Sequence, residues 1–386
     1  MSRSGACRIS VHISGHGYGH LAQTAAVLAA LRRLDSRLEL RLVCPHPRTA
    51  LQSRIAEPFT HIMRPVDVAL VQDHPMHPDL ARTRAAHLAW AAGWAGALDR
   101  ESAELTSWQA DLVLSNIACL PLVAARRCGV PAVALASLWW PDIIAPYFPG
   151  DQEMAALCGN MRAALAHADV ALLSRPCLPD PPFPRIVHLD PVWQPNAATT
   201  NTELRQFLGV DPTDRRPLVL VSLGGIVARD LPFLAMQRQN AVLWLVDQGH
   251  YPEACADNIL GVSFTAQWPF GRVLSACDAV VGKPGYGMVV ECTVAKIPLL
   301  YMRRHHFCDE VPLCHWLHQH NRAKELDASQ FQSGEWQHHL EELWSIPAPP
   351  PPSCRGAEQA AEAVARWLPI AANPAGTSLD MQSYNN

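Results

Sequence analysis

Two glycine-rich turns carry the residue types that could bind an anion and move a proton. The first, GHGYG at Gly15–Gly19, follows the apolar run Ile9–Ser14 and leads at His20 into an alanine- and leucine-rich helical pattern that ends near Leu34. Glycines there allow positive φ, and the N–H groups of the helix N-terminus can donate to an anion. Because the positive end of the helix dipole lowers the pKa of an imidazole, His20 is a candidate general base, with His16 second. An ordinary capping or core role for His20 stays equally open.

The second turn, GKPGYG at Gly282–Gly287, enters a helical pattern that carries Glu291. Backbone amides at Gly285–Gly287 could hold a diphosphate, and Lys283 would add positive charge. Glu291, one turn into the helix, could accept two hydrogen bonds from ribose hydroxyls. The turn is no Walker A loop, because the glycine spacing differs and Lys283 is not followed by Ser or Thr. A carboxylate that only stabilises its own helix is the alternative for Glu291.

A charged segment directly follows the apolar run Leu299–Met302. Its arginines, Arg303 and Arg304, could pair with phosphate. Its carboxylates, Asp309 and Glu310, could accept hydrogen bonds from sugar hydroxyls. A solvated loop with local ion pairs is the alternative interpretation.

Short β-rich runs alternate with helical patterns in both halves of the chain, which predicts parallel strands joined by helices. In the first half the predicted strands are Ile9–Ser14, Leu38–Cys44, His61–Arg64, Ala110–Ser115 and Ala132–Leu135, with a long helical stretch over Leu80–Trp108. In the second half they are Leu218–Ser222, Ala241–Val246, Gly261–Phe264, Ala279–Val281 and Leu299–Met302.

The repetition predicts an α/β protein of two Rossmann-like, doubly wound domains. The proline-dense segment Pro176–Pro195 suits an extended linker that neither a helix nor a central strand could use, so the predicted domains are residues 1–190 and 196–346. A last helix is expected over about residues 355–369, and residues 370–386 are expected to be disordered. Ligands of such sheets bind beyond the carboxyl ends of the strands, where both turns and the charged segment lie.

Composition excludes several classes of partner. A formal net charge of −4 leaves no basic surface for nucleic acid. The 12 cysteines are scattered without a CxxC pair, and adjacent histidines point to different faces of an element, so no metal site is expected. The polar start and the lack of an apolar run of ~20 residues argue against a signal peptide and a transmembrane segment. We therefore expect a cytoplasmic protein with a small ligand, and peripheral association with the inner face of a membrane stays open.

Six segments, in this order, resemble the N-terminal, non-kinase half of L-arabinokinases and their stand-alone bacterial relatives. They are SGHGYGH (Ser14–His20), ADLVLSN (Ala110–Asn116), SLWWPDIIAPY (Ser137–Tyr147), SLGG (Ser222–Gly225), LSACDAVVGKPGYGMVVE (Leu274–Glu291) and KIPLLYMRRHHFCDE (Lys296–Glu310). The pattern is more distantly similar to the peptidoglycan N-acetylglucosaminyltransferase and to UDP-glycosyltransferases. The kinase half is absent, so the resemblance implies no sugar-kinase activity.

The resemblance implies the GT-B fold, two Rossmann-like domains facing across a cleft with the last helix crossing back to the first domain. It implies a donor site in the second domain at Gly224, Gly225, Lys283, Gly285, Tyr286, Gly287, Glu291, Arg303, Arg304, Asp309 and Glu310. It implies an acceptor side in the first domain at Gly17, Tyr18, Gly19, Asn116, Trp140 and Asp142. Relatives often have Gln at the position of Glu310, which leaves the identity of the sugar open, and tend to have Asp at that of Asn116, which argues against a base at position 116.

The expected function is the metal-independent transfer of a sugar, assisted by a general base and with inversion, from a nucleotide diphosphate sugar to the hydroxyl of a small-molecule or lipid-linked acceptor. No cofactor is expected beyond this donor substrate. Two alternatives stay open. One is a nucleotide-sugar epimerase or hydrolase, and the other is a non-catalytic subunit that binds sugar nucleotides.

Overall fold

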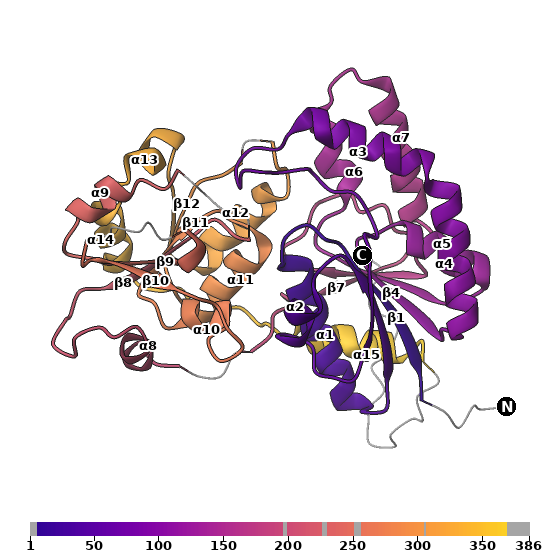
Figure 1. The fold of residues 1–386 in the computed structure, drawn as a ribbon, viewed down its shortest axis with the longest axis horizontal. Helices are drawn as coiled ribbons and strands as arrows, with labels where there is room; N and C mark the ends of the chain where they lie inside the picture. Colours follow the sequence, from indigo (N-terminus) through magenta and orange to yellow (C-terminus); the bar gives the residue numbers. More distant parts are fainter. Residues whose placement is uncertain (1–5, 196–198, 226–229, 251–255, 305, 369–386) are drawn as a thin grey trace.

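The computed structural model describes residues 6–195, 199–225, 230–250, 256–304 and 306–368. These residues form two parallel β-sheets, each covered by helices, that lie side by side (Figure 1). The expected tail at residues 370–386 lies outside the described residues. Within the described part of the chain, no helix is long and apolar enough to cross a membrane.

The first sheet has seven strands in the order β3-β2-β1-β4-β5-β6-β7. The strands are β1 (Arg8–Ile13), β2 (Glu39–Cys44), β3 (Thr60–Met63), β4 (Leu112–Asn116), β5 (Ala132–Ala136), β6 (Val170–Ser174) and β7 (Ile186–Leu189). The helices are α1 (Gly19–Leu34), α2 (Arg48–Gln52), α3 (Leu80–Ala92), α4 (Trp94–Trp108), α5 (Leu120–Cys128), α6 (Trp140–Ile144) and α7 (Gln152–Leu165). The central strands are mainly apolar and fully buried, as expected of a parallel sheet covered on both faces.

The second sheet has six strands in the order β10-β9-β8-β11-β12-β13. The strands are β8 (Leu218–Ser222), β9 (Leu243–Asp247), β10 (Ile259–Val262), β11 (Ala279–Gly282), β12 (Leu299–Tyr301) and β13 (Ala323–Glu325). The helices are α8 (Asn201–Phe207), α9 (Phe233–Arg238), α10 (Phe270–Ser275), α11 (Tyr286–Ala295), α12 (Glu310–His320), α13 (Ala328–Ser333) and α14 (Gln337–Ser345).

Both sheets reverse their winding at the same place, between the first and the fourth strand. In the first sheet this point lies between β1 and β4, and in the second between β8 and β11. A doubly wound sheet opens a crevice beyond the carboxyl ends of its strands at such a point. The turns at Gly15–Gly19 and Gly282–Gly287 follow β1 and β11, so the topology places both in crevices.

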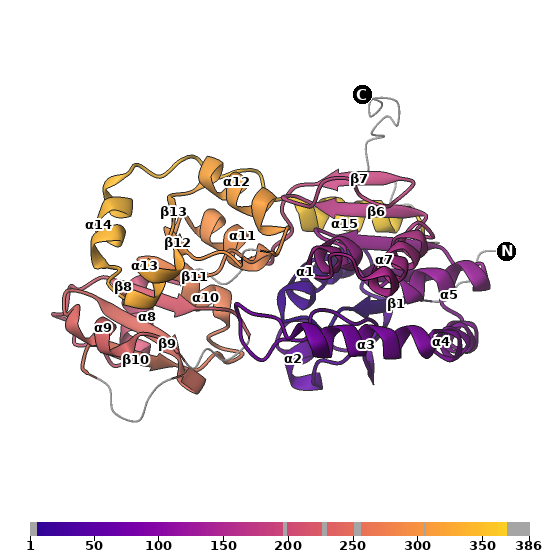
Figure 2. The same cartoon turned by 90° about the horizontal axis from the view of Figure 1, so that it is seen from above.

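The last helix, α15 (Gly356–Ala365), packs on the first domain, as expected of the GT-B fold (Figure 2). Ala357, Ala360 and Val364 are buried in the same apolar core as α1 and β1. A Cβ on Gly356 would lie 2.1 Å from the backbone oxygen of Asp190, so the helix starts against the end of the first domain.

Two expected elements differ from the structure. The helical stretch Leu80–Trp108 is two helices, because Gly93 ends α3 and begins α4. The segment Pro176–Pro195 is not wholly a linker, since it contains β7, which pairs with β6 at the edge of the sheet where prolines can be tolerated. The first sheet ends at Leu189 and the second begins at Leu218, and the boundary between the domains stays a prediction.

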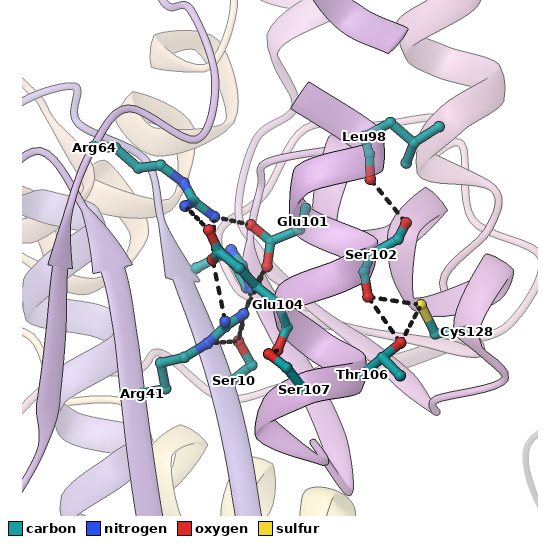
Figure 3. A network of polar contacts seen from close by, with 11 residues as sticks. Ser10, Arg41, Arg64, Leu98, Glu101, Ser102, Glu104, Thr106, Ser107 and Cys128 are labelled. Carbon is teal, nitrogen blue, oxygen red and sulfur yellow. Dashed lines mark hydrogen bonds and ion pairs between the residues drawn. The ribbon is translucent and has the colours of Figure 1, made fainter. Parts of the chain in front are cut away.

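A buried ionic network fixes α4 to the first sheet (Figure 3). The guanidinium of Arg41, on β2, donates to Glu101 Oε1 at 2.7 Å and to Ser10 Oγ at 2.8 Å. Arg64, after β3, also pairs with Glu101 and donates to Glu104 Oε2 at 2.9 Å. Buried charges are stable only when paired and hydrogen-bonded, which these are.

Candidate functional site

A cavity of about 1170 Å³ lies between the two domains, and the predicted turns meet in it. It is lined by the residues after β1, β8, β11 and β12, as the two winding reversals require. The predicted site residues that line it are His16, Gly17, Tyr18, Gly19, His20, Gly224, Gly225, Lys283, Gly285, Tyr286, Gly287, Glu291, Arg304 and Asp309. Those that do not line it are Asn116, Trp140, Asp142, Arg303 and Glu310.

His20 is held in one tautomer by Asn116. The amide Nδ2 of Asn116 donates to the backbone oxygen of His20 at 3.1 Å. A carbonyl oxygen only accepts, so Asn116 Oδ1 is the atom 2.9 Å from His20 Nδ1, and Nδ1 carries the proton. Nε2 is then left with a free lone pair. Burial lowers the pKa of His20 to about 4, so the ring is neutral near pH 7.

His16 lies against an aromatic wall. Its ring meets Trp140 edge-on at 5.0 Å between centroids and stacks on Phe307 at 6.2 Å. Burial, with the charge of Arg304, lowers the pKa of His16 well below its usual value. Trp140 itself is only 1% exposed, and its Nε1 donates to Asp67 Oδ2 at 2.9 Å. Trp140 therefore backs the histidines and offers no face for stacking on an acceptor.

The remaining acceptor-side prediction, Asp142, forms an ion pair with Arg162. On the side of the first domain, the cavity is lined instead by the turn at Gly17–Gly19 and by residues that the sequence reasoning missed. Tyr18 reaches across the cleft, where a Cβ on Gly225 would lie 3.0 Å from its ring. Tyr18 thus contacts the second domain directly.

The donor half of the cavity is built on the N-terminus of α11. Gly285 is its N-cap, in an extended conformation, and no side chain caps it. The first-turn N–H groups therefore can donate to a ligand. Gly224, opposite, has φ +87°, which favours glycine, and a Cβ there would lie 3.2 Å from the Lys283 side chain. Burial, with the charge of Arg304, lowers the pKa of Lys283 to about 7.

Glu291 has a carboxylate oxygen that is buried without a hydrogen-bond partner, Oε2. Burial raises the pKa of this carboxyl to about 7, opposed by the charge of Arg54. If Glu291 only stabilised its own helix, its carboxylate would be expected to bond to the backbone or to face solvent. An unpartnered acceptor that lines a cavity is suited to bind a ligand hydroxyl.

Some residues of the charged segment line the cavity, and others form ion pairs outside it. Glu310 is 1% exposed and accepts from Arg304 Nε at 2.6 Å and from the backbone N–H of Arg304 at 2.7 Å. It holds the guanidinium at the cavity instead of facing the cavity itself. Arg303 donates to Glu325 at 2.8 Å and points away. Asp309 lines the cavity with an unpartnered Oδ1, and burial raises its pKa to about 7.

Sequence reasoning missed several cavity residues, including Gln23, Arg54, Ser137 and Phe307. Gln23 follows His20 by three positions on α1, so helical spacing alone could have found it. Arg54 follows α2, and no local signal relates it to a turn more than 200 residues away. In the described part of the chain, no group of three or more His, Cys, Asp or Glu could hold a metal ion.

Comparisons with known proteins agree with this architecture. No family model matches the sequence. Among curated proteins, the chain is 22% identical over 349 residues to an L-arabinokinase of Arabidopsis thaliana, an alignment covering 87% of this chain and 32% of that protein. The chain thus spans about a third of the length of the relative it matches.

Several solved structures that resemble the chain are titled as glycosyltransferases. SnogD from Streptomyces nogalater gives a TM-score of 0.56 at 20% identity, covering 94% of this chain and 100% of that one. Phytolacca americana UGT2, complexed with UDP-2fluoro-glucose and pterostilbene, gives 0.61 at 16%, covering 94% and 100%. Acinetobacter baumannii MurG gives 0.52 at 14%, covering 93% and 99%. These likenesses show the fold, which is the two-domain α/β arrangement of GT-B glycosyltransferases.

Proposed function

We propose that the chain is a glycosyltransferase that moves a sugar from a nucleotide diphosphate sugar to a hydroxyl group in the interdomain cavity. The observation that carries this is the joining, in one cavity, of an uncapped helix N-terminus with the side chains of Lys283 and Arg304 and a neutral histidine. The names of the structural relatives support the same reaction class, since two of them are titled as glycosyltransferases or as complexes with a nucleotide sugar.

The donor is proposed to lie on the second domain. The N–H groups of Tyr286 and Gly287 bind the diphosphate, because the Gly285 N–H already donates to the backbone oxygen of Lys283 at 2.9 Å, and Lys283 and Arg304 contribute charge. Glu291 accepts hydrogen bonds from the ribose, and Asp309 from the sugar, through the oxygens that lack partners in the structure. A nucleotide sugar would thereby satisfy both buried carboxylates, which gives binding energy and specificity.

The chemical step is proposed to use His20 as the general base. The acceptor oxygen attacks the anomeric carbon, its proton passes to His20 Nε2, and the bond from that carbon to the diphosphate breaks with its electron pair on the diphosphate. Lys283, Arg304 and the α11 N-terminus stabilise the departing charge. Because His20 and α11 come from opposite domains, acceptor and leaving group are proposed to sit on opposite faces of the sugar, which inverts its configuration. These groups suffice for a mechanism without a metal, which is part of the proposal.

A second candidate function is turnover or binding of the nucleotide sugar without an acceptor. The partner of His20 is the neutral amide of Asn116, which orients the ring but cannot stabilise an imidazolium as a carboxylate would. An epimerase, a hydrolase or a binding subunit needs less stabilisation of a charged His20 than transfer to an acceptor does.

A ligand screen tests the donor site. Thermal unfolding is measured with UDP, GDP, dTDP and CMP sugars, because a ligand that binds only the folded state raises the melting temperature. We expect one class to stabilise the wild type and the Glu325→Gln variant, whose carboxylate lies outside the cavity, and to stabilise Glu291→Gln less. No stabilisation by any of these compounds at millimolar concentration would refute the donor site.

Product analysis then separates transfer from the alternatives. The protein is incubated with the stabilising nucleotide sugar, with and without a panel of small-molecule and lipid-linked alcohols. A new glycoside formed only with an acceptor supports transfer, whereas free sugar or an isomer without acceptor supports the second candidate. For transfer, His20→Ala should lower turnover by about 10²–10⁴-fold. Turnover within a few-fold of the exposed control His188→Ala would assign His20 a structural role.

A further inference from the structure

A loop of the first domain, Val71–Asp79, runs from the start of α3 to the second domain (Figure 2) and is called the strap below. Its base is closed by the Asp79 N–H, which donates to the backbone oxygen of Val71 at 2.8 Å. The Val71 N–H donates to Thr83 Oγ1 at 3.0 Å, and the Asp79 side chain caps α3. Both ends of the strap are therefore fixed to α3.

The tip of the strap is buried in the second domain. Met76 is 6% exposed and belongs to an apolar cluster whose other buried members lie between Val219 and Leu343. The backbone N–H of Met76 donates to His74 Nδ1 at 3.2 Å, so the ring proton of His74 is on Nε2. Nε2 then donates to Asp230 Oδ1, 3.1 Å away in the second domain. A methionine of the first domain thus fills part of the core of the second.

The first domain holds the donor turn at two points. Lys283 Nζ donates at 3.4 Å to the backbone oxygen of Pro75, the neighbour of Met76 in the strap. The Tyr286 hydroxyl accepts from the N–H of Val192 at 2.9 Å, in the connection that follows β7. An ammonium has three N–H groups, so the bond to Pro75 leaves two for the oxygens of a diphosphate. Lys283 is therefore oriented by the first domain although it belongs to the second.

The ionisation of Lys283 depends on its cover. Burial lowers the pKa of Lys283 to about 7, the charge of Arg304 acts in the same direction, and Glu310 and Asp309 oppose it. The strap contributes to this burial, because the Pro75 oxygen lies against the ammonium. If the strap were detached, water would reach the ammonium and the pKa of Lys283 would rise. The titration of this lysine thus reports whether the strap is in place.

We propose that Met76 is a positioning residue for Lys283, whose anchoring in the second domain keeps the Pro75 carbonyl on the ammonium and the cavity closed around the donor diphosphate. The proposal rests on the donor site described above. Without the anchor, the nucleotide itself has to bring the domains together and to orient the ammonium. Part of its binding free energy is then spent on ordering the protein, which weakens binding.

The test compares the wild type with Met76→Ala, which removes the anchor, and with Met76→Leu, which nearly conserves its volume. The matched control is Met236→Ala, because Met236 is fully buried in the same cluster but comes from the second domain itself. Thermal unfolding shows that each variant is folded, and Met76→Val replaces Met76→Ala if the latter is not. The chain has three lysines, Lys283, Lys296 and Lys324, so ¹³C NMR of labelled lysine follows each titration separately in the absence of ligand.

The pKa of Lys283 should be about 7 in the wild type, Met76→Leu and Met236→Ala, and about one unit higher or more in Met76→Ala. Calorimetry with UDP, GDP and dTDP measures binding. A nucleotide that binds the wild type should bind Met76→Ala about tenfold more weakly and Met236→Ala with unchanged affinity.

An unchanged Lys283 titration or nucleotide affinity in Met76→Ala, or an equal change in Met236→Ala, would overturn the positioning role and leave the donor site standing. If none of the three nucleotides binds the wild type, the donor site is refuted and this proposal with it.

Discussion

Replacing Asn116 by Asp tests the link between the proposed base and its partner. The substitution is nearly isosteric and puts a carboxylate oxygen 2.9 Å from His20 Nδ1, where the wild type has a neutral amide oxygen. The carboxylate favours the imidazolium by Coulomb attraction inside a buried site. The variant also loses the NH₂ group that donates to the backbone oxygen of His20 at 3.1 Å and to Thr24 Oγ1 at 3.1 Å.

This geometry sets the expected change in the pKa of His20 and in the stability of the variant. An opposite charge at hydrogen-bond distance raises a histidine pKa by about one to three pKa units. From about 4 in the wild type, His20 should then titrate at about 5 to 7. The carboxylate also faces a backbone oxygen that has lost a donor, which should cost about 1–3 kcal/mol of stability near neutral pH.

The sign of the pH effect is fixed by linkage. In the wild type the folded pKa of His20, about 4, lies below the unfolded value of 6.5, so the unfolded state binds more protons and stability is lost as pH falls from 6.5 toward 4. In Asn116→Asp this loss should shrink, because the two pKa values approach one another. Stability of the variant relative to the wild type should therefore improve on acidification through this window.

The assay is an NMR titration of histidine resonances between about pH 4 and pH 8, paired with urea unfolding at both ends. Asn321→Asp is the control, because buried Asn321 also donates to a backbone oxygen, that of Ile297 at 2.8 Å, far from any proposed base. It should lose stability without moving the His20 titration. If His20 titrates at the same pH in Asn116→Asp as in the wild type, the contact between residue 116 and His20 Nδ1 is refuted.

Three further predictions concern stability. The folded pKa of Asp309, about 7, exceeds its usual 3.8, so the cost of burying this carboxyl grows as pH rises from 3.8 to 7. Asp309→Asn should therefore stabilise the fold at pH 8 by up to roughly 4 kcal/mol but should not stabilise it at pH 3.5. Thermal unfolding at the two pH values checks this. Glu101→Ala leaves Arg41 buried without its main partner and should cost about 3–5 kcal/mol in urea unfolding; a loss under about 1 kcal/mol would show that water replaces the pair. Gly356→Ala drives a methyl group into the backbone oxygen of Asp190 and should cost about 1–3 kcal/mol, and an unchanged unfolding midpoint would disprove the close packing of α15.

Local patterns in the sequence located most of the strands around the site. The predicted strand Leu218–Ser222 has the bounds that the structure shows, because it combines an apolar run with clear flanking signals. The break at Gly93 and the edge strand Ile186–Leu189 were not predictable in this way. A glycine is tolerated within many helices, and edge pairing depends on a neighbour that the local pattern does not reveal.

The candidate site likewise contains residues that the sequence could place and residues that it could not. Glycine turns, Glu291 and Asp309 could be placed in a cleft because a residue's position after a parallel strand follows from order along the chain. The role of Glu310 could not, since its proximity to Asp309 in sequence says nothing about the Arg304 guanidinium that turns it away from the cavity. Arg54 could not be placed either, because nothing local brings α2 toward Glu291.

The sequence by itself determined the alternation of strands and helices and the residue types at the two turns, since backbone conformation and amphipathic period are local properties. Only the tertiary structure decided which atoms are free to act. The lone pair on His20 Nε2 depends on Asn116, which lies 96 residues away, and the anchoring of Tyr286 depends on the other domain. Hydrogen-bond partners across such separations are chosen by packing, so the chemistry of this cavity is a property of the folded chain.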